Sequence, residues 1–262
     1  MAHVVITGAS SGIGAALVAE YARSGAAVTL VARRQAEMAE LAARVGGRTQ
    51  CFGLDLADAS RALSFLGPAQ ERFGSVDVLI NNAGVQIVQP AEEHDPAAIQ
   101  TLLTLNLTVP MLLTRALLPA MLERGSGTIV NVSSVAGLAP TPGMWAYNAS
   151  KSGLGAASES LRGVLRRTGV HVLTVYPGPV DTQMARDATA AYPDNLSVRL
   201  LPAGVPEELA RRVRAAVELR RPRVVYPLFY HTSRYFPTVA RFFLDQFTPR
   251  AKSARGHGPG PR

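Results

Sequence analysis

Short aliphatic runs alternate with longer helical segments along almost the whole chain, and this alternation limits the folds that the sequence can adopt. The expected strands are His3–Thr7, Ala27–Val31, Arg48–Leu54, Val76–Ile80, Thr128–Val132, Val170–Tyr176 and Arg223–Tyr226. Most of these runs are continuously apolar rather than alternately apolar and polar. Continuous runs are typical of central parallel strands that are covered on both faces.

Helical segments fill the intervals between the expected strands. They are Gly12–Ser24, Arg34–Val45, Ala59–Phe73, Pro96–Arg124, Tyr147–Arg167 and Pro206–Arg220. A strand followed by a helix, repeated in this way, predicts an α/β fold. We therefore expect a doubly wound, mostly parallel, seven-stranded sheet with helices on both of its faces.

Nothing in the composition divides the chain into separate units. Of its 262 residues, 47% are hydrophobic and 18% are charged, which excludes disorder over most of the length. Residues 1–250 are expected to form a single domain, because no charge-rich linker interrupts them. Residues 251–262 are rich in Gly, Pro and Arg and are expected to be a disordered basic tail.

Positive charge is concentrated toward the C-terminus. The net charge is +8, and residues 206–262 hold 12 basic and 4 acidic side chains, whereas residues 1–205 hold 15 of each. A nucleic-acid-binding domain more often carries a basic stripe on its main body. The distribution therefore argues against nucleic acid as a partner.

The sequence favours a cytoplasmic location. Met1–Val4 lacks the positively charged n-region of a signal peptide. The apolar stretch Leu102–Leu122 contains two prolines and Arg115, so a buried helix is favoured over a membrane span. The single cysteine, Cys51, excludes an intramolecular disulfide and suits a reducing compartment.

A glycine-rich turn joins the first expected strand to the first expected helix, with the sequence Thr7-Gly8-Ala9-Ser10-Ser11-Gly12-Ile13-Gly14. Gly8 would allow a sharp turn, Gly12 a close approach of backbone N–H groups to a pyrophosphate, and Gly14 close packing of helix on sheet. A helix N-terminus also attracts anions. The turn therefore predicts a Rossmann-type dinucleotide site, the alternative being an ordinary glycine-rich strand-to-helix turn.

The glycine spacing, Gly-x-x-x-Gly-x-Gly, and an ordered series of further motifs resemble the short-chain dehydrogenase/reductase family. The motifs are Asp55-Leu56, Asn81-Asn82-Ala83-Gly84, Asn106, Ser133-Ser134, Tyr147-x-x-x-Lys151 and Pro177-Gly178. They follow the order and spacing of the family over residues 7–178. The resemblance is to the short, single-domain branch, and it implies a Rossmann-type oxidoreductase.

The residues after the second expected strand favour NADP over NAD. In Rossmann sites that bind NAD, an acidic residue about 20 positions after the glycine loop holds the ribose 2′-hydroxyl, but Ala32 stands there. Arg33 follows, and a guanidinium can bind a 2′-phosphate, the alternative being a solvated arginine that opens a helix. The resemblance implies further cofactor-binding residues: Gly8, Ser10, Ser11, Gly12, Ile13, Gly14, Asp55, Leu56, Asn82, Ala83, Gly84, Tyr147, Lys151, Pro177, Gly178, Val180 and Thr182.

Tyr147 and Lys151 are four residues apart on an expected helix, so they share a face. A lysine ammonium about 5 Å from the phenol would lower the tyrosine pKa by roughly two units, toward the range of a general acid/base. By resemblance, Ser134 hydrogen-bonds the substrate oxygen, and Asn106 anchors a water that leads to Lys151. The alternative for Asn106 is a buried amide satisfied by backbone groups.

These residues imply an NADP-dependent ketone reductase or alcohol dehydrogenase, in which Tyr147 exchanges a proton with the substrate oxygen as hydride is transferred. Two alternatives are a regulatory NADP-binding protein without turnover and an enzyme similar to the sugar-nucleotide epimerases and dehydratases. The complete set of Ser134, Tyr147 and Lys151 argues against the first, and the short-branch glycine spacing against the second. The five histidines show no metal-ligand spacing, and Cys51 is interpreted as a core residue.

Aromatic residues gather near the C-terminus, where eight of the 16 lie between Tyr226 and Phe247. Phe236, Val239, Phe243 and Phe247 follow helical spacing. Such a face could close the core, form a subunit interface, cover the site as a lid, or contact a membrane surface with the nearby arginines.

The substrate and the assembly are less constrained by the sequence. The family's variable substrate region follows the sixth strand, within residues 179–250, and the aromatic C-terminal end favours an apolar or bulky substrate. Trp145, two residues before Tyr147, could form the floor of a pocket or fill the core. By resemblance we expect a homo-dimer or homo-tetramer, formed through the helices expected at 96–124 and 147–167.

Overall fold

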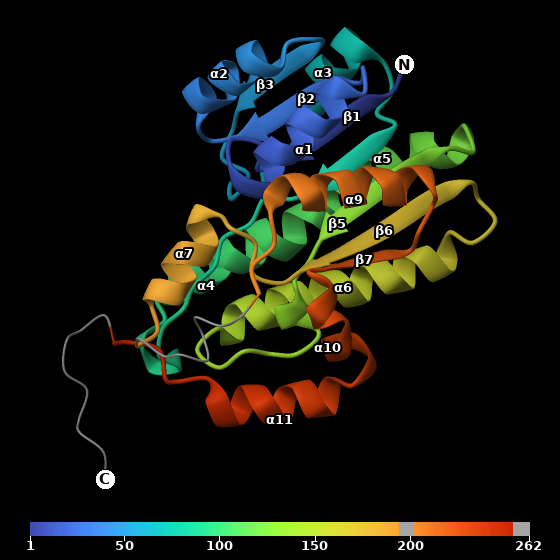
Figure 1. The fold of residues 1–262 in the computed structure, drawn as a ribbon. Helices are drawn as coiled ribbons and strands as arrows, with labels where there is room; N and C mark the ends of the chain where they lie inside the picture. The colour runs from blue at the N-terminus through green and yellow to red at the C-terminus, as the bar shows by residue number, and fades with distance from the viewer. Residues whose placement is uncertain (194–201, 254–262) are drawn as a thin grey trace.

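A single parallel sheet forms the centre of the molecule, for which the computed structural model describes residues 1–193 and 202–253. Within these residues seven strands lie in the order β3-β2-β1-β4-β5-β6-β7 (Figure 1). They are β1 (His3–Thr7), β2 (Ala27–Ala32), β3 (Thr49–Gly53), β4 (Val78–Asn81), β5 (Gly127–Val132), β6 (Val170–Pro177) and β7 (Arg223–Tyr226). The order reverses between β1 and β4, and doubly wound sheets bind ligands outside the carboxyl ends of the strands at such a point. The doubly wound α/β fold expected from the alternation is confirmed.

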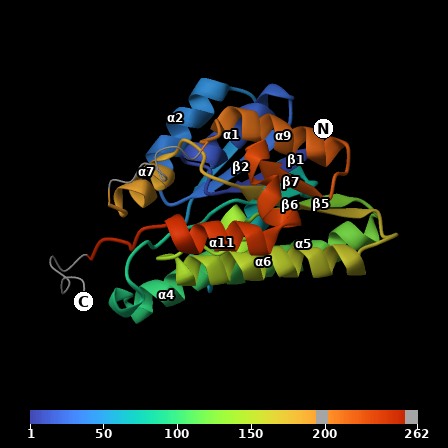
Figure 2. The ribbon, with the colours of Figure 1, turned by 60° about the horizontal axis from the view of Figure 1, so that its bottom comes forward.

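Helices cover both faces of this sheet. Helices α1 (Gly12–Arg23), α2 (Gln35–Val45) and α9 (Pro206–Glu218) lie on one face, and α3 (Leu66–Phe73), α5 (Val109–Glu123) and α6 (Trp145–Val164) on the other (Figure 2). The remaining helical elements are η1 (Ala91–Glu93), α4 (Pro96–Leu103), the π-helical turn η2 (Thr104–Thr108), η3 (Val135–Gly137), α7 (Gln183–Ala190), η4 (Leu228–Tyr230), α10 (His231–Tyr235) and α11 (Pro237–Phe247).

Successive residues of β1 contribute to two separate cores. Val4 and Ile6 pack with α1, α2 and α9, whereas Val5 packs with α3 and α5, and all three side chains are fully buried. Burying one such side chain stabilises the fold by about 1.5–3 kcal/mol. Because both faces are buried, the strands are continuously apolar, and the polar residues that follow them mark their carboxyl ends.

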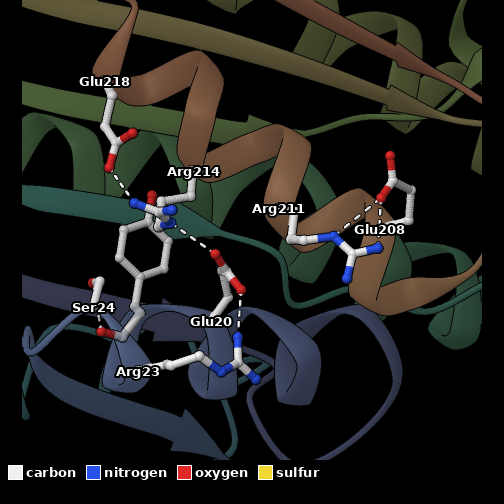
Figure 3. Close-up of polar contacts among 8 residues, drawn as sticks. Glu20, Arg23, Ser24, Glu208, Arg211, Arg214 and Glu218 are labelled. Carbon is white, nitrogen blue, oxygen red and sulfur yellow. Dashed lines mark hydrogen bonds and ion pairs between the residues drawn. The ribbon is translucent and has the colours of Figure 1, made fainter.

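An ion-pair cluster joins α1 to α9, which are far apart in the sequence (Figure 3). The nearly buried Glu20 carboxylate accepts hydrogen bonds from Arg23 at 2.6 Å and from Arg214 at 2.7 Å. Arg214 also pairs with Glu218. The two guanidiniums compensate for the burial of the carboxylate, and the cluster fixes α9 against the helix that follows the glycine-rich turn.

The long helix expected over 96–124 is interrupted by the π-helical turn at Thr104–Thr108. Here the Val109 N–H bonds the Thr104 carbonyl, five residues earlier. Pro110 follows, and it has no N–H to donate and would clash with the preceding turn of a regular α-helix. The whole stretch Pro96–Glu123 is the one helical segment of the described residues that is long and apolar enough to cross a membrane. Its α5 part nevertheless packs on the sheet, with Leu113 and Leu117 in the second core.

Two other segments differ from expectation. Helix α3 begins at Leu66 rather than Ala59, because residues 58–66 form successive turns in which N–H groups bond carbonyls three residues earlier, as Arg61 does to Asp58 at 3.1 Å and Ser64 to Arg61 at 2.9 Å. The expected tail begins at Ala251, but Ala251 packs on a buried cluster, and the Lys252 N–H donates to the Ala191 carbonyl at 2.8 Å. Residues 254–262 of that tail, and residues 194–201 of the expected substrate region, lie outside the described part of the chain.

Candidate active site

The glycine-rich turn leads from β1 into α1 at the carboxyl edge of the sheet. Gly8 and Gly12 have positive φ values, of 66° and 54°, which glycine adopts without strain. A Cβ on Gly14 would overlap the Gly8 carbonyl oxygen, so the helix approaches the strand more closely than any side chain allows. The N-terminal N–H groups of α1 consequently lie at the point where the strand order reverses, an arrangement that can bind an anion.

Arg34, rather than Arg33, contacts this turn. Its guanidinium donates to the Ser11 hydroxyl at 2.6 Å and to the Ser10 hydroxyl at 3.1 Å. Arg33 is exposed, next to the buried Ala32. Arg33 is the residue that the sequence led us to expect at a 2′-phosphate, but Arg34 offers the same guanidinium one position later.

The loop after β4 is bonded to the end of β1. The Asn82 side-chain amide donates to the Thr7 carbonyl at 3.0 Å, and the Thr7 hydroxyl accepts from the backbone N–H groups of Asn82 and Ala83. On the other side of the turn, a Cβ on Gly12 would lie 3.0 Å from Thr182 Cγ2. The turn therefore lies between Asn82 and Thr182 at the switch point.

Other residues expected to bind a cofactor are placed by backbone contacts. Asp55 follows β3, and its carboxylate accepts from the Ala57 N–H at 3.0 Å. The Gly178 N–H donates to the Tyr226 carbonyl at 2.7 Å. Val180 forms an isolated parallel bridge with Gly204. These contacts fix the loops after β3 and β6, but they do not bring Asp55 to the residues around Tyr147.

Ser134, Tyr147 and Lys151 meet where β5 ends and α6 begins. The Ser134 side chain hydrogen-bonds the Tyr147 hydroxyl. The Lys151 ammonium lies 5.8 Å from the centroid of the Tyr147 ring and donates to the Val132 carbonyl at 2.9 Å. Ser133 has a different contact, because its hydroxyl donates to the Lys151 carbonyl at 2.7 Å. Of the two adjacent serines, only Ser134 contacts the phenol.

Asn106 lies in the π-helical turn and is completely buried. Its side-chain amide exchanges two 2.9 Å hydrogen bonds with the Val85 backbone and donates to the Ser150 hydroxyl at 3.1 Å. A Cβ on Gly84 would lie 3.1 Å from Asn106 Oδ1 and 3.4 Å from Lys151 Nζ. The Asn106 amide is therefore largely satisfied by backbone groups, as one of the two interpretations of this residue expected. The same contacts hold the loop after β4 beside Lys151.

Known proteins are similar to this chain in sequence and in fold. The family model described as "short chain dehydrogenase" matches residues 2–193. The chain belongs to the short-chain dehydrogenase/reductase family. A ketoacyl reductase, HetN of Nostoc sp., is 35% identical over 226 residues, which are 85% of this chain and 77% of that protein.

Two solved structures extend the comparison to almost the full length. A short-chain dehydrogenase from Streptomyces avermitilis superimposes with a TM-score of 0.81 at 32% identity, covering 93% of this chain and 95% of the other. One from Sphingobium yanoikuyae, in complex with NADPH, has a TM-score of 0.79 at 30% identity and covers 98% and 100%. This short-chain dehydrogenase is therefore an oxidoreductase with the family's single-sheet fold.

Burial controls the electrostatics of the dehydrogenase site. It raises the pKa of Tyr147, and the hydrogen bond from Ser134 opposes this only in part. Burial also lowers the pKa of Lys151 to about 8. The lowering of the tyrosine pKa expected from Lys151 is not found, because removing both groups from water disfavours the tyrosinate and the ammonium alike.

The C-terminal part of the dehydrogenase packs on the same cluster as the tyrosine. Tyr147, Tyr192 and Met144 share a buried apolar cluster with Ala251. The Tyr192 hydroxyl donates to the Pro142 carbonyl at 2.6 Å, and a Cβ on Gly143 would lie 3.1 Å from Ala251 Cβ. Sequence reasoning missed these contacts, because Ala251 carries no chemical signal.

Trp145 lies at the edge of this cluster. Its side chain is 50% exposed, and its ring is 5.5 Å from that of His94. Of the two alternatives left open for Trp145, the one in which it fills the core is therefore contradicted, and the one in which it forms the floor of a pocket stays a prediction. Its exposure at the start of α6, two residues before Tyr147, leaves it accessible to a ligand.

Proposed function

We propose that this protein is an NADP(H)-dependent carbonyl reductase or alcohol dehydrogenase that uses Tyr147 as its general acid/base. The observation that carries the proposal is the contact between Ser134 and Tyr147, beside Lys151 and at the same carboxyl edge as the glycine-rich turn. A nucleotide site alone would serve a regulatory protein. A buried acid/base with a hydrogen-bonding partner is what proton transfer to a substrate oxygen requires.

The residues present fit a dinucleotide. Gly12 lacks the Cβ that would lie against Thr182 and so leaves backbone N–H groups open to a pyrophosphate, while Gly14 lets α1 pack against Gly8 beside Asn82. A 2′-phosphate is favoured over a bare hydroxyl, because Ala32 takes the place of an acid and two arginines follow it. The NADPH in the Sphingobium structure supports this preference.

Three side chains divide the work on the substrate. When bound, the nicotinamide supplies or accepts the hydride. Ser134 hydrogen-bonds the substrate carbonyl oxygen and orients it toward the phenol. Tyr147 gives its proton to the developing alkoxide in reduction and removes the hydroxyl proton in oxidation. Lys151 places a positive charge near the phenol and binds the ribose.

The raised pKa of Tyr147 keeps the phenol protonated at neutral pH, which is the form that acts as an acid in reduction, whereas oxidation needs the tyrosinate. An apolar carbonyl substrate suits the cluster of Tyr192, Met144 and Ala251 next to the phenol. We further propose a cytoplasmic homo-oligomer, whose subunits meet through α5 and α6.

A turnover assay tests the reaction. Purified protein is incubated with NADPH or NADH and a panel of carbonyl compounds from small sugars to long-chain ketones, and absorbance at the nicotinamide band is followed. We expect NADPH oxidation with apolar ketones, and loss of at least ~10³-fold in kcat for Tyr147→Phe with nearly unchanged NADPH affinity. Wild-type activity in Tyr147→Phe, or tight NADPH binding without turnover of any carbonyl, would contradict the proposal.

A further inference from the structure

Helix α11 exposes an uncharged apolar face. Val239, Phe242 and Phe243 are 53%, 60% and 54% exposed, and the preceding Phe236 is 63% exposed. Helical spacing puts these residues on one side, and Arg241 and Asp245 on the opposite side. The segment therefore combines an amphipathic pattern with an apolar face that the rest of the described chain does not cover.

The exposed rings contact one another. Phe242 and Phe243 meet edge to face at 5.8 Å, and the rings of Phe243 and Phe247 stack at 6.0 Å. In Figure 1, α11 lies at the outer edge of the molecule, away from the sheet. A contiguous exposed apolar patch of this kind marks an interaction surface.

Charge distinguishes between the possible occupants of this face. The described residues 228–253 contain four basic side chains and one acidic side chain, Asp245, and of the four Arg234 lies 3.9 Å from the Glu159 carboxylate. In a two-fold interface with a second copy, this excess would meet an identical excess, and like charges repel. An anionic lipid surface would attract it, since basic segments bind such surfaces and aromatic rings insert between the lipids.

We propose that α11 docks the protein on an anionic membrane surface, with its Val239/Phe242/Phe243 face in the headgroup region and with Arg250 and Lys252 near the lipid phosphates. The segment that follows α11 returns to the cluster around Tyr192, where Ala251 packs against Gly143. Docking would therefore place the substrate side of the molecule close to the bilayer. The docking itself does not depend on the reaction proposed above.

Vesicle flotation tests the proposal on the full-length protein. Two kinds of vesicle are used: phosphatidylcholine alone, and phosphatidylcholine with 30% phosphatidylglycerol. We expect binding to the anionic vesicles only, weakening as salt is raised. The double variant Phe242→Ser/Phe243→Ser should lower the fraction bound at least ~10-fold, since it removes two inserting rings. Leu219→Ser, which changes a 63% exposed leucine at the end of α9, is the matched control and should bind as the wild type does.

Three results would overturn docking on lipid: no binding of the wild type to anionic vesicles, equal binding by the double variant, or equal loss in Leu219→Ser. Sedimentation velocity without lipid tests whether a second copy of the chain covers this face instead. If the wild type is an oligomer and the double variant is not, the face is a subunit interface. Thermal unfolding is measured in parallel. Val239→Asp, which places a charge on the same face, provides a second variant and should also lose binding.

Discussion

The Nζ atom of Lys151 donates a hydrogen bond to the Val132 carbonyl at 2.9 Å, so the ammonium is anchored to the end of β5 within a buried site. This contact explains how a lysine is held one helical turn from Tyr147 without pairing with a carboxylate. Burying the ammonium also lowers the stability of the fold, because a charged group with one neutral acceptor is less well solvated than it would be in water.

Lys151→Met should stabilise the protein while abolishing its activity. The lysine pKa is lowered from 10.5 in the unfolded chain to about 8 in the fold. The unfolded state therefore binds more protons between these values, and the penalty for burying the ammonium is largest below pH 8. We expect the variant to gain about 1–3 kcal/mol at pH 7.

That gain should disappear as the pH rises from 8 toward 10.5, because the folded lysine is then already neutral. Urea unfolding at pH 7 and pH 10 measures both values. Lys252→Met, at the exposed lysine near the C-terminus, is the control and should show no such dependence. A pH-independent gain would mean that packing, and not the charge, sets the difference.

The adjacent serines should differ in their effect on kcat. Ser134→Ala removes the partner of the Tyr147 hydroxyl, and we expect kcat to fall about 10²-fold or more. It also removes a buried hydroxyl that accepts from the Ala136 N–H at 3.1 Å, which should cost roughly 1 kcal/mol of stability. Ser133→Ala removes a buried hydrogen bond to the Lys151 carbonyl and should cost a similar amount, with kcat within a few-fold. Steady-state kinetics and urea unfolding of both variants check this, and a large loss of kcat in Ser133→Ala alone would exchange their roles.

Arg34 should contribute more to the NADP preference than Arg33. Its guanidinium already lies on the Ser10 and Ser11 hydroxyls, next to the anion site. Arg34→Ala is expected to weaken NADPH binding about 10- to 100-fold and NADH binding much less, since a charge-assisted pair contributes roughly 1.5–3 kcal/mol. Fluorescence titration compares it with Arg33→Ala and with Arg44→Ala, an exposed control on α2. If only Arg33→Ala loses the preference for NADPH over NADH, Arg33 and not Arg34 binds the 2′-phosphate.

Two truncations should differ in their effect on KM. Ending the chain after Ser253 keeps Ala251 on the Tyr192 cluster and should leave the kinetics unchanged. Ending it after Thr248 removes Ala251 together with the bond from the Lys252 N–H to the Ala191 carbonyl. The shorter protein should then show a KM for apolar ketones raised several-fold with a smaller change in kcat. Equal kinetics for the two proteins would show that this segment does not border the substrate.

The sequence was sufficient for the features that repeat along the chain. β1 and β7 have the expected bounds, because buried parallel strands are unbroken aliphatic runs with polar or glycine residues at their ends. The motif residues Ser134, Tyr147 and Lys151 come together because each follows or lines the carboxyl edge of β5.

The features that the sequence did not reveal depend on contacts between distant segments. Helical periodicity over Ala59–Phe73 does not show that residues 58–66 form successive turns before the helix begins. Nor does an alanine at 251 indicate that it packs against Gly143. The pKa of Tyr147 depends on how deeply the phenol is buried, and the spacing of residues along a helix does not give that burial.

The π-helical turn before Pro110 contains one residue more than a regular α-helical turn. This extra residue determines how the preceding helical residues are rotated about the helix axis relative to α5. Each residue of an α-helix advances by about 100°, so removing a single residue between Thr104 and Thr108 would rotate the Asn106 amide away from Val85. The loop after β4 would lose its anchor although no residue of that loop had changed. In this enzyme a one-residue deletion in the turn is therefore expected to be more harmful than most substitutions there.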